Sequence, residues 1–468
     1  MSSEWPTVQL SDCAEFQEGY VNPSQRNSDF FDGPIKWLRA VDLNDSIVSD
    51  TTRTLSEKGF RSAGKSALLF EPGSLAISKS GTIGRLGILE DYMCGNRAVI
   101  NIRVNHSICD KYYIFYVLKS KRAEIESLAT GSVQKNLYTS VLGSMELDLP
   151  PLETQKAIAR QLWSLDKKIQ INHQINQTLE QMAQAIFKSW FVDFEPVKAK
   201  IAALEAGGSE EDALLAAMQA ISGNGEAELT RLQSEQPEQY AELCATAELF
   251  PSAMQDSELG EIPEGWESGT LSDIASFSSN RIPKHELTLE TYISTENMLE
   301  NKKGVCPASS LPSSASVPGF EPGEILISNI RPYFKKIWLA NISGGRSPDV
   351  LGFSPKHKGT NEYLFNLLYQ DCFFDYMMLT SKGAKMPRGD KKAIMQFATA
   401  TPPIDLMRHF SEHVKSFYLL ATSQHRESES LASVRDSLLP KLLSGELAVS
   451  DDENQLMAES ISPLQEVN

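Results

Sequence analysis

The chain has 468 residues and a formal net charge of −17, with 41% hydrophobic and 22% charged residues. This composition is typical of a folded globular protein with room for two or three domains. No apolar run reaches the ~18 residues of a membrane span and the polar start has no signal-peptide pattern, so we expect a cytoplasmic protein with no membrane partner. The six cysteines form no C-x-x-C pair, so the sequence predicts neither a disulfide framework nor a zinc cluster.

Residues 1–151 combine short apolar runs with turn residues, which is typical of mixed α and β structure. The segment 68–78 predicts a strand, a Pro-Gly turn and a second strand. Pro150 and Pro151 cannot lie inside a helix, so they mark the start of the element that follows. Residues 1–150 carry 16 basic and 18 acidic side chains, so this domain is close to neutral and can meet DNA phosphates locally.

Residues 152–202 are expected to form a long central helix. Apolar residues recur there at alternating spacings of three and four, which is the pattern of a coiled-coil seam with two asparagines at its centre. About 36 helical residues would span roughly 54 Å, the length of a rigid spacer. The predicted seam of this helix contains Leu162, Leu165, Ile169, Asn172, Asn176 and Leu179.

The rest of the chain divides into four further segments. Residues 203–262 are acidic and predict a partly helical linker, and residues 263–403, with 15 basic and 14 acidic side chains, predict a second mixed α/β domain. Residues 404–449 predict a second spacer helix, and residues 450–468 are polar and acidic, so we expect a disordered tail. The predicted seam of the second helix contains Val414, Phe417, Gln424, Leu431 and Leu438.

The second half of the chain repeats the first. The pattern of Trp, Leu, Ser, Asp, Ala and Phe in residues 5–16 returns in residues 266–277 at an offset of 261. Glu71-Pro72-Gly73 returns as Glu321-Pro322-Gly323, at an offset of 250, and the Pro-Pro at 150 returns at 402. A period this long indicates two copies of a whole domain related by a pseudo-two-fold axis. Two similar but non-identical surfaces suit a ligand with two similar but non-identical halves.

Four spaced motifs carry a family resemblance. Leu259-Gly-Glu-Ile-Pro-Glu-Gly-Trp266 opens a domain, Pro150-Pro-Leu-Glu-Thr-Gln-Lys-Ala-Ile158 opens a helix, Phe187-Lys-Ser-Trp-Phe-Val-Asp-Phe194 ends it, and Arg435-Asp-Ser-Leu-Leu-Pro-Lys-Leu-Leu-Ser-Gly-Glu-Leu447 closes the second helix. In this order they resemble the specificity subunits of type I restriction-modification systems. One departure is Met407, which stands where the first copy has Gln155 and puts the symmetry of the docking surface in doubt.

The resemblance implies an α+β fold and a function. It implies two pseudo-symmetric target-recognition domains, separated by long helices that form an intramolecular coiled coil, and each domain reads one half of an asymmetric bipartite site in double-stranded DNA. The helices are expected to dock two modification subunits, which bind S-adenosylmethionine and methylate adenine. Restriction subunits that use ATP and Mg²⁺ join the same complex. The specificity subunit is itself expected to catalyse nothing and to hold no cofactor or metal.

The candidate DNA-binding residues lie in two pairs of loops. In each domain one polar or Gly-rich loop follows the strand after the Pro-Gly turn, and another lies about 50 residues later. Arg and Lys recognise guanine or phosphate and Asn recognises adenine, so these loops could enter a groove. The alternative is that they are solvated turns. The candidates are Lys79, Thr82, Arg85, Gln134, Lys135 and Asn136 in the first domain and Asn329, Arg331, Tyr333, Lys335, Lys336, Lys385, Arg388 and Lys391 in the second.

Competing motifs favour other functions less well. Residues 59–66 match the phosphate-loop pattern G-x-x-x-x-G-K-S, but the polar segment before them and the short strand-like segment after them do not fit a phosphate loop. Asp349 with Asp390 and Lys391 could belong to a self-sufficient Mg²⁺-dependent endonuclease, and His409 with His413 could share a metal if a third ligand existed. A helical adaptor without sequence preference is the remaining alternative.

Overall fold

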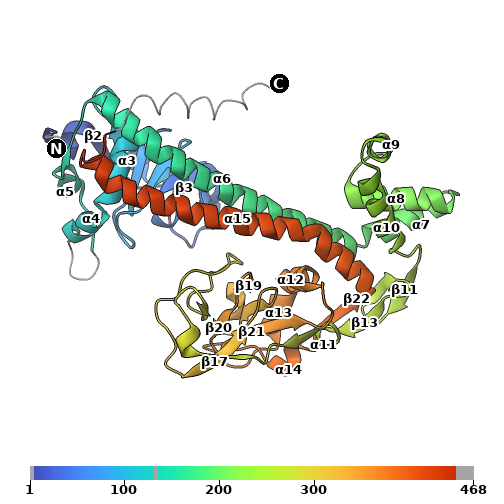
Figure 1. Ribbon diagram of the computed structural model, residues 1–468. Coiled ribbons are helices and arrows are strands. Elements are labelled where there is room, and N and C mark those ends of the chain that lie inside the picture. The colour runs from blue at the N-terminus through green and yellow to red at the C-terminus, as the bar shows by residue number, and fades with distance from the viewer. Residues whose placement is uncertain (1–4, 131–134, 449–468) are drawn as a thin grey trace. The chain divides into compact units, whose positions relative to one another are not determined.

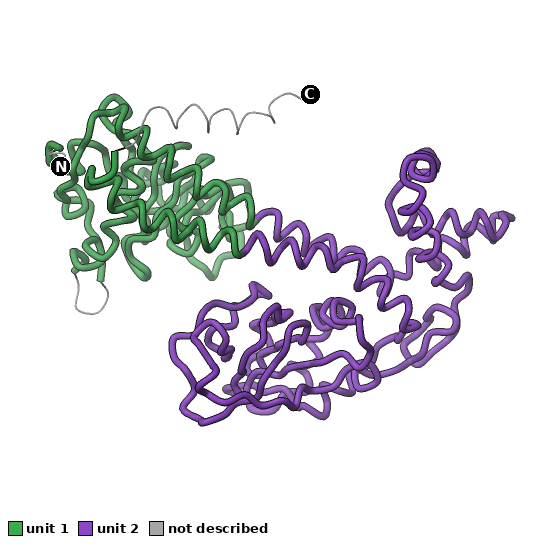
Figure 2. The backbone as a smooth tube through the Cα atoms, viewed as in Figure 1, with its two compact units in different colours: residues 1–173, 426–468 green, residues 174–425 purple. Residues whose placement is uncertain are grey.

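The structure is a computed structural model that describes residues 5–130 and 135–448. It divides into two compact units, residues 1–173 with 426–468 and residues 174–425, which Figure 2 colours separately. Two 40-residue helices, α6 (Leu152–Phe191) and α15 (Ile404–Leu443), each contribute residues to both units. No helix in the described part of the chain is long and apolar enough to cross a membrane.

The first unit is built on a five-stranded sheet with the strand order β2-β9-β6-β7-β4. All its neighbouring pairs are antiparallel except β4 and β7. A three-stranded sheet, β5-β3-β8, lies in the same unit, and strands β1 and β10 pair where the domain begins and ends. The bounds are β1 Thr7–Gln9, α1 Leu10–Cys13, β2 Ala14–Glu18, β3 Phe31–Leu38, β4 Ser46–Val48, β5 Thr54–Leu55, α2 Glu57–Arg61, β6 Leu75–Ser78, β7 Leu86–Leu89, β8 Cys94–Gly95, β9 Val99–Val104, α3 Lys111–Ser120, α4 Arg122–Leu128, α5 Thr139–Gly143 and β10 Glu146–Asp148.

The second unit repeats this plan. Its four-stranded sheet has the order β14-β21-β18-β19, and β13 pairs with β22 as β1 pairs with β10. A further sheet, β15-β17-β20-β16, completes the domain. The bounds are β13 Glu267–Thr270, α11 Leu271–Ile274, β14 Ala275–Phe277, β15 Arg281–Pro283, β16 Tyr292–Ile293, β17 Ser316–Phe320, β18 Ile325–Ser328, η5 Pro332–Phe334, β19 Ile337–Leu339, β20 Gly344–Arg346, β21 Val350–Pro355, α12 Asn361–Tyr369, α13 Asp371–Leu379, α14 Lys391–Ile394 and β22 Ala398–Thr401.

The repeated Glu-Pro-Gly motif forms the same turn before an inner strand of the sheet in both domains. Gly73 and Gly323 have φ angles of 80° and 88°, in the left-handed region that costs other residues about 1–2 kcal/mol. Each turn leads directly into a fully buried strand, β6 or β18. A conserved backbone conformation therefore places the same central strand in both domains.

The two long helices complete the core of each unit. In the first unit Leu162 of α6 and Leu442 of α15 are fully buried in the core of the domain. In the second unit Phe187 and Trp190 of α6 pack edge-on against Phe410 of α15, with ring centroids 5.6 and 5.8 Å apart. In each unit residues of the long helices therefore belong to the same core as residues of the sheet. Figure 1 labels both long helices, α6 and α15.

The acidic segment folds to a greater extent than the sequence predicts. The expected central helix over 152–202 ends at Phe191, and a separate helix, α7 (Glu195–Glu205), follows it. The acidic segment then contains α8 (Glu210–Ser222), α9 (Glu226–Glu235) and α10 (Pro237–Glu248), followed by the hairpin of β11 (Met254–Ser257) and β12 (Gly260–Pro263). The apolar faces of α8, α9 and α10 form a small core of their own. The buried Lys200 of α7 donates to the carbonyl oxygen of Phe250 in the acidic segment at 2.6 Å. Burial lowers the pKa of Lys200.

Candidate nucleic-acid interface

In the first unit the two expected loops are joined through their backbones. The first loop connects β6 to β7, and Gly81 and Gly84 take left-handed conformations inside it. An antiparallel bridge links Ser80 to Asn136, and the Leu137 N–H donates to the Lys79 carbonyl oxygen at 2.9 Å. The structure therefore pairs two segments whose bridged residues are 56 positions apart in the sequence.

The expected side chains of the first unit differ in exposure. Thr82 and Lys135 are exposed, whereas Arg85 and Asn136 are half-buried. Lys79 pairs with Glu18 at 2.8 Å and its side chain is 14% exposed. The ion pair therefore stabilises the loop and leaves little of the side chain accessible to a ligand. Gln134 lies outside the described residues.

In the second unit the equivalent loops are joined at equivalent positions. Ile330 is bridged to Arg388, which matches the bridge of Ser80 to Asn136 at offsets of 250 and 252 residues. The Arg331 N–H donates to the Pro387 carbonyl oxygen at 2.8 Å. Each domain therefore presents one composite surface built from two loops.

Several expected side chains of the second unit are engaged within the domain. Asn329 is 3% exposed and donates to the Gly389 carbonyl oxygen at 3.2 Å, so in this structure it holds the second loop and does not face solvent. Lys335 pairs with Asp371 at 3.0 Å, Lys336 donates to the Thr295 carbonyl oxygen at 2.8 Å, and Arg388 pairs with Asp349. Arg331 is half-buried, and Tyr333, Lys385 and Lys391 are exposed.

The carboxylates of this surface are also engaged. Hydrogen bonds from Lys302 and Lys335 lower the pKa of Asp371. Asp390 pairs with Lys382 at 2.5 Å and caps α14 by accepting from the Lys392 N–H, and the Lys382 hydrogen bond is the largest cause that lowers its pKa. Asp390 is therefore a capping residue and Asp349 a partner of Arg388.

The structure does not favour the competing motifs. Within residues 5–130 and 135–448 no three His, Cys, Asp or Glu side chains are grouped to hold a metal ion. Gly59–Ser66 spans the end of α2 and the short 3₁₀ turn η3 (Gly64–Ser66), without the buried strand and following helix of a phosphate loop. His413 stacks on Trp190 with ring centroids 6.0 Å apart, and His409 lies 3.5 Å from the Thr246 hydroxyl.

The predicted helix seam can be followed within each unit. In the first unit Asn172 is fully buried and donates to Glu427 at 2.8 Å, and Lys168 lies 3.6 Å from the same carboxylate. Because a residue late in the unit's part of α6 meets one early in its part of α15, the helices are antiparallel there. Leu162, Asn172 and Val414 are buried, and Leu165, Ile169, Asn176, Leu179, Phe417, Gln424, Leu431 and Leu438 are half-buried.

Each domain is fastened to its helices by a different polar cluster. In the first unit Asp166 of α6 accepts from Tyr116 of α3 at 2.7 Å and pairs with Arg435 of α15 and Lys119 of α3. Burial lowers the pKa of Arg435, but hydrogen bonds and charges from Asp166 and Asp436 outweigh it, so the pKa is raised overall. Sequence analysis missed these residues, because an acidic residue on a helix gives no signal of its partners.

The second unit uses uncharged groups for the same purpose. Asn366 of α12 is fully buried and accepts from Gln184 of α6 at 2.5 Å and from Tyr418 of α15 at 3.1 Å. Gln370 donates to Gln184 at 2.7 Å. Burial is the largest cause that raises the pKa of Tyr418.

Gln155 and Met407, the position where the two copies differ, are both internal. Gln155 is fully buried, accepts from the Asp110 N–H at 2.9 Å and donates to the Pro150 carbonyl oxygen at 2.8 Å. Met407 is 1% exposed in the core of the second unit. The difference therefore concerns packing inside each domain and not an outer docking surface.

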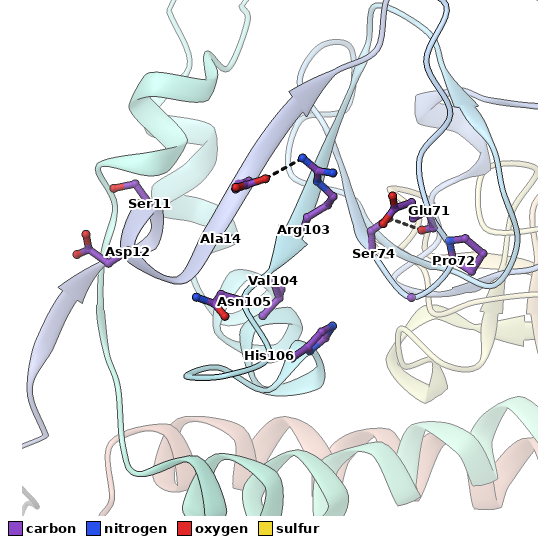
Figure 3. A pocket seen from close by; sticks show the side chains of 12 residues that line it. Ser11, Asp12, Ala14, Glu71, Pro72, Ser74, Arg103, Val104, Asn105 and His106 are labelled. Atoms are coloured by element: carbon purple, nitrogen blue, oxygen red, sulfur yellow. Dashed lines mark hydrogen bonds and ion pairs between the residues drawn. The ribbon is translucent and has the colours of Figure 1, made fainter.

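An open cleft of about 520 Å³ lies elsewhere in the first unit, beside the loop after β9 (Figure 3). The residues that line the cleft include Asp12, Asn105 and His106. Arg103 and Glu15, which also line it, form an ion pair at 2.7 Å. None of the expected DNA-binding residues lines this cleft. The loop surfaces and the cleft are therefore separate features.

Two copies of one mixed α/β domain, each with a joined pair of loops, define a tandem-repeat protein. Residues 2–181 match the family model described as type I restriction modification DNA specificity domain. The type I restriction enzyme HindI specificity subunit of Haemophilus influenzae is 30% identical over 378 residues, covering 77% of this chain and 82% of that protein. The chain therefore belongs to the family of type I restriction enzyme specificity subunits, whose role is DNA sequence specificity and not catalysis.

One other sequence relative and one solved structure align with nearly the whole chain. The MjaIX specificity subunit of Methanocaldococcus jannaschii is 23% identical over 475 residues, covering 96% of this chain and 94% of that protein. The crystal structure of the type I restriction-modification system S subunit from M. genitalium covers 94% of this chain and 96% of that one, with 15% identity and a TM-score of 0.48.

Proposed function

We propose that this chain reads an asymmetric bipartite DNA site, one half with each domain. The joined loops at Ser80 with Asn136 and at Ile330 with Arg388 carry this proposal, because the same backbone arrangement presents different side chains in the two domains. Equivalent surfaces with different chemistry suit half-sites of different sequence. DNA and the other subunits of a type I restriction-modification complex are its partners.

The catalytic activities of the complex belong to its other subunits. Two modification subunits dock on the α6 and α15 helices, bind S-adenosylmethionine and methylate adenine, and restriction subunits use ATP and Mg²⁺. The chain itself contributes sequence choice. The polar helix centre around Asn172 supports an antiparallel helix pair of fixed register, since a buried amide tolerates few alternative pairings.

Single-molecule sequencing of DNA tests the proposal directly. Cells that express the chain with its modification subunit are compared with cells that lack the chain. We expect adenine methylation at one split, asymmetric motif that disappears without the chain. An intact complex that methylates no motif, or a single undivided one, contradicts the proposal.

Domain exchange gives the second test. Replacing residues 1–151 by the corresponding domain of another specificity subunit is expected to change one half of the methylated motif and leave the other half intact. The replacement domain must keep Tyr116 and Lys119, so that the cluster at Asp166 still forms. A change in both halves of the motif would contradict the proposal that each domain recognises one half-site.

The rival functions predict other results. A self-sufficient endonuclease would cut plasmid DNA with Mg²⁺ and no partner, and an adaptor would select no sequence from random DNA. The purified chain, assayed alone and with its modification subunits, separates these outcomes.

A further inference from the structure

The loop surface of the second unit exposes apolar side chains. Tyr333 is 48% exposed, Met386 is 55% exposed, and Leu379, at the end of α13, is 82% exposed. The hydrogen bond from Arg331 to Pro387 joins the segments that carry Tyr333 and Met386, and α13 packs against the turn that contains Tyr333. Grouped exposed apolar side chains are typical of interaction sites.

Three of the charged side chains expected to lead recognition in this unit are paired within the domain. Lys335, Lys336 and Arg388 are all engaged with Asp371, Thr295 or Asp349, as described above. Lys385 is exposed on the second loop, and Lys391 is exposed at the start of α14. Exposed apolar side chains and exposed lysines therefore both occur on these two joined segments.

The turn that presents Tyr333 is held rigidly. The 3₁₀ turn η5 lies between Arg331 and Lys335, two non-glycine residues with φ angles of 50° and 49°. Such conformations cost about 1–3 kcal/mol each and persist where surrounding contacts impose them, often at functional sites. The Lys335 N–H donates to the Pro332 carbonyl oxygen at 2.8 Å, and the Tyr333 and Phe334 rings lie 4.6 Å apart. The ring is therefore presented by a preorganised backbone.

We propose that Tyr333 and Met386 form an apolar surface that reads the 5-methyl group of a thymine in the second half-site. This inference rests on the proposed function. Among the base edges in the major groove, the thymine methyl is the apolar feature, so it matches exposed apolar side chains. Lys385 and Lys391 complement the phosphates beside it. The second half-site therefore contains an A·T pair at one required position.

The test uses the specificity subunit in complex with its modification subunits and the motif obtained by sequencing. Each thymine of the second half-site is replaced in turn by uracil, which lacks only the methyl group. We expect one uracil to weaken equilibrium binding by ~4-fold, the effect of one buried methyl group. Tyr333→Ala and Met386→Ala are each expected to reduce this discrimination, whereas Tyr333→Phe keeps it, because the ring and not the hydroxyl makes the contact.

Three results would overturn the inference: a second half-site without an A·T pair, equal binding of every uracil duplex and the thymine duplex, or full discrimination in both alanine variants. If Tyr333→Ala does not fold, Met386→Ala and Tyr333→Leu carry the comparison. Failure here is separable from failure of the proposed function, because the wild-type complex still methylates its split motif in the first case and not in the second.

Discussion

Arg435 of α15 and Asp166 of α6 form an ion pair in the first unit, and both side chains are only 14–15% exposed. The same carboxylate accepts from Tyr116 and lies 3.5 Å from Lys119, so three elements meet at one acidic residue. Removing one member of such a group leaves the others buried without compensation.

Asp166→Asn is therefore expected to lower the free energy of unfolding by about 2–4 kcal/mol, measured by urea denaturation. Asp436→Asn is the matched control, because Asp436 also pairs with Arg435 but its side chain is 62% exposed. The control should cost no more than about 1 kcal/mol. Equal losses in the two variants would contradict the anchoring role of Asp166.

Gly323→Ala is expected to destabilise the second unit more than Gly73→Ala destabilises the first. Both positions have positive φ, which costs alanine about 1–2 kcal/mol. At Gly323 a Cβ would also lie 2.6 Å from Asn361 Nδ2, whose hydrogen bond to the Gly323 carbonyl oxygen it would disturb. At Gly73 the nearest atom is the flexible Lys111 Nζ at 3.3 Å.

Thermal denaturation of the two glycine variants measures this difference. A Gly73→Ala variant as unstable as Gly323→Ala would show that the left-handed backbone, and not the contact with Asn361, sets the cost.

Acid is expected to weaken the second unit through His413. Desolvation lowers the pKa of His413 from its ordinary value near 6.5, against an opposing effect of Glu242, because the ring stacks on the buried Trp190 although the residue keeps an exposed edge. The unfolded chain then binds the proton more readily than the folded one, so this contribution to stability is present above pH 6.5 and is lost as pH falls through the lower folded value. His413→Gln should flatten the loss of unfolding free energy between pH 7.5 and about 5.

Denaturant titrations across this pH range provide the measurement. His285→Gln provides the same substitution at a solvent-exposed position, because the His285 side chain is 81% exposed. A His413→Gln curve that coincides with the wild type would rule out this contribution.

Lys65→Ala is expected to leave DNA methylation unchanged. Lys65 is exposed in a 3₁₀ turn, and the segment lacks the geometry that cradles phosphate. Calorimetry of the purified chain with ATP should show no binding in the wild type or the variant. ATP binding that disappears in Lys65→Ala would restore the phosphate-loop interpretation.

The regular elements could be predicted from the sequence because their signals are local. The central helix expected over 152–202 is found as Leu152–Phe191, shorter at its C-terminal end because Phe194 takes a left-handed conformation before the separate helix Glu195–Glu205, and the Pro-Gly turns lead into buried strands as expected. The acidic segment was less predictable, because its charges lie outside a small core whose alanine and leucine contacts come from separate helices.

Side-chain roles in the loops could not be predicted, since they depend on partners distant in sequence. The Asn329 side chain donates a hydrogen bond to Gly389, 60 residues away, and Lys335 forms an ion pair with Asp371. Conversely, Met386 gave no signal, because a methionine among glycines and lysines resembles any exposed turn. Composition identified the loops, but only the fold shows which of their side chains are free to reach outward.

The bridges from Ser80 to Asn136 and from Ile330 to Arg388 are made by the main chain. Every amino acid except proline supplies the same N–H and carbonyl groups. The hydrogen bonds of these bridges therefore do not depend on which side chains the bridged residues have. Mutations on the loop surface can therefore accumulate without separating the loops. Under the proposed function, a lineage would acquire a new DNA target by changing a few exposed residues, while the backbone architecture that displays them is inherited unchanged.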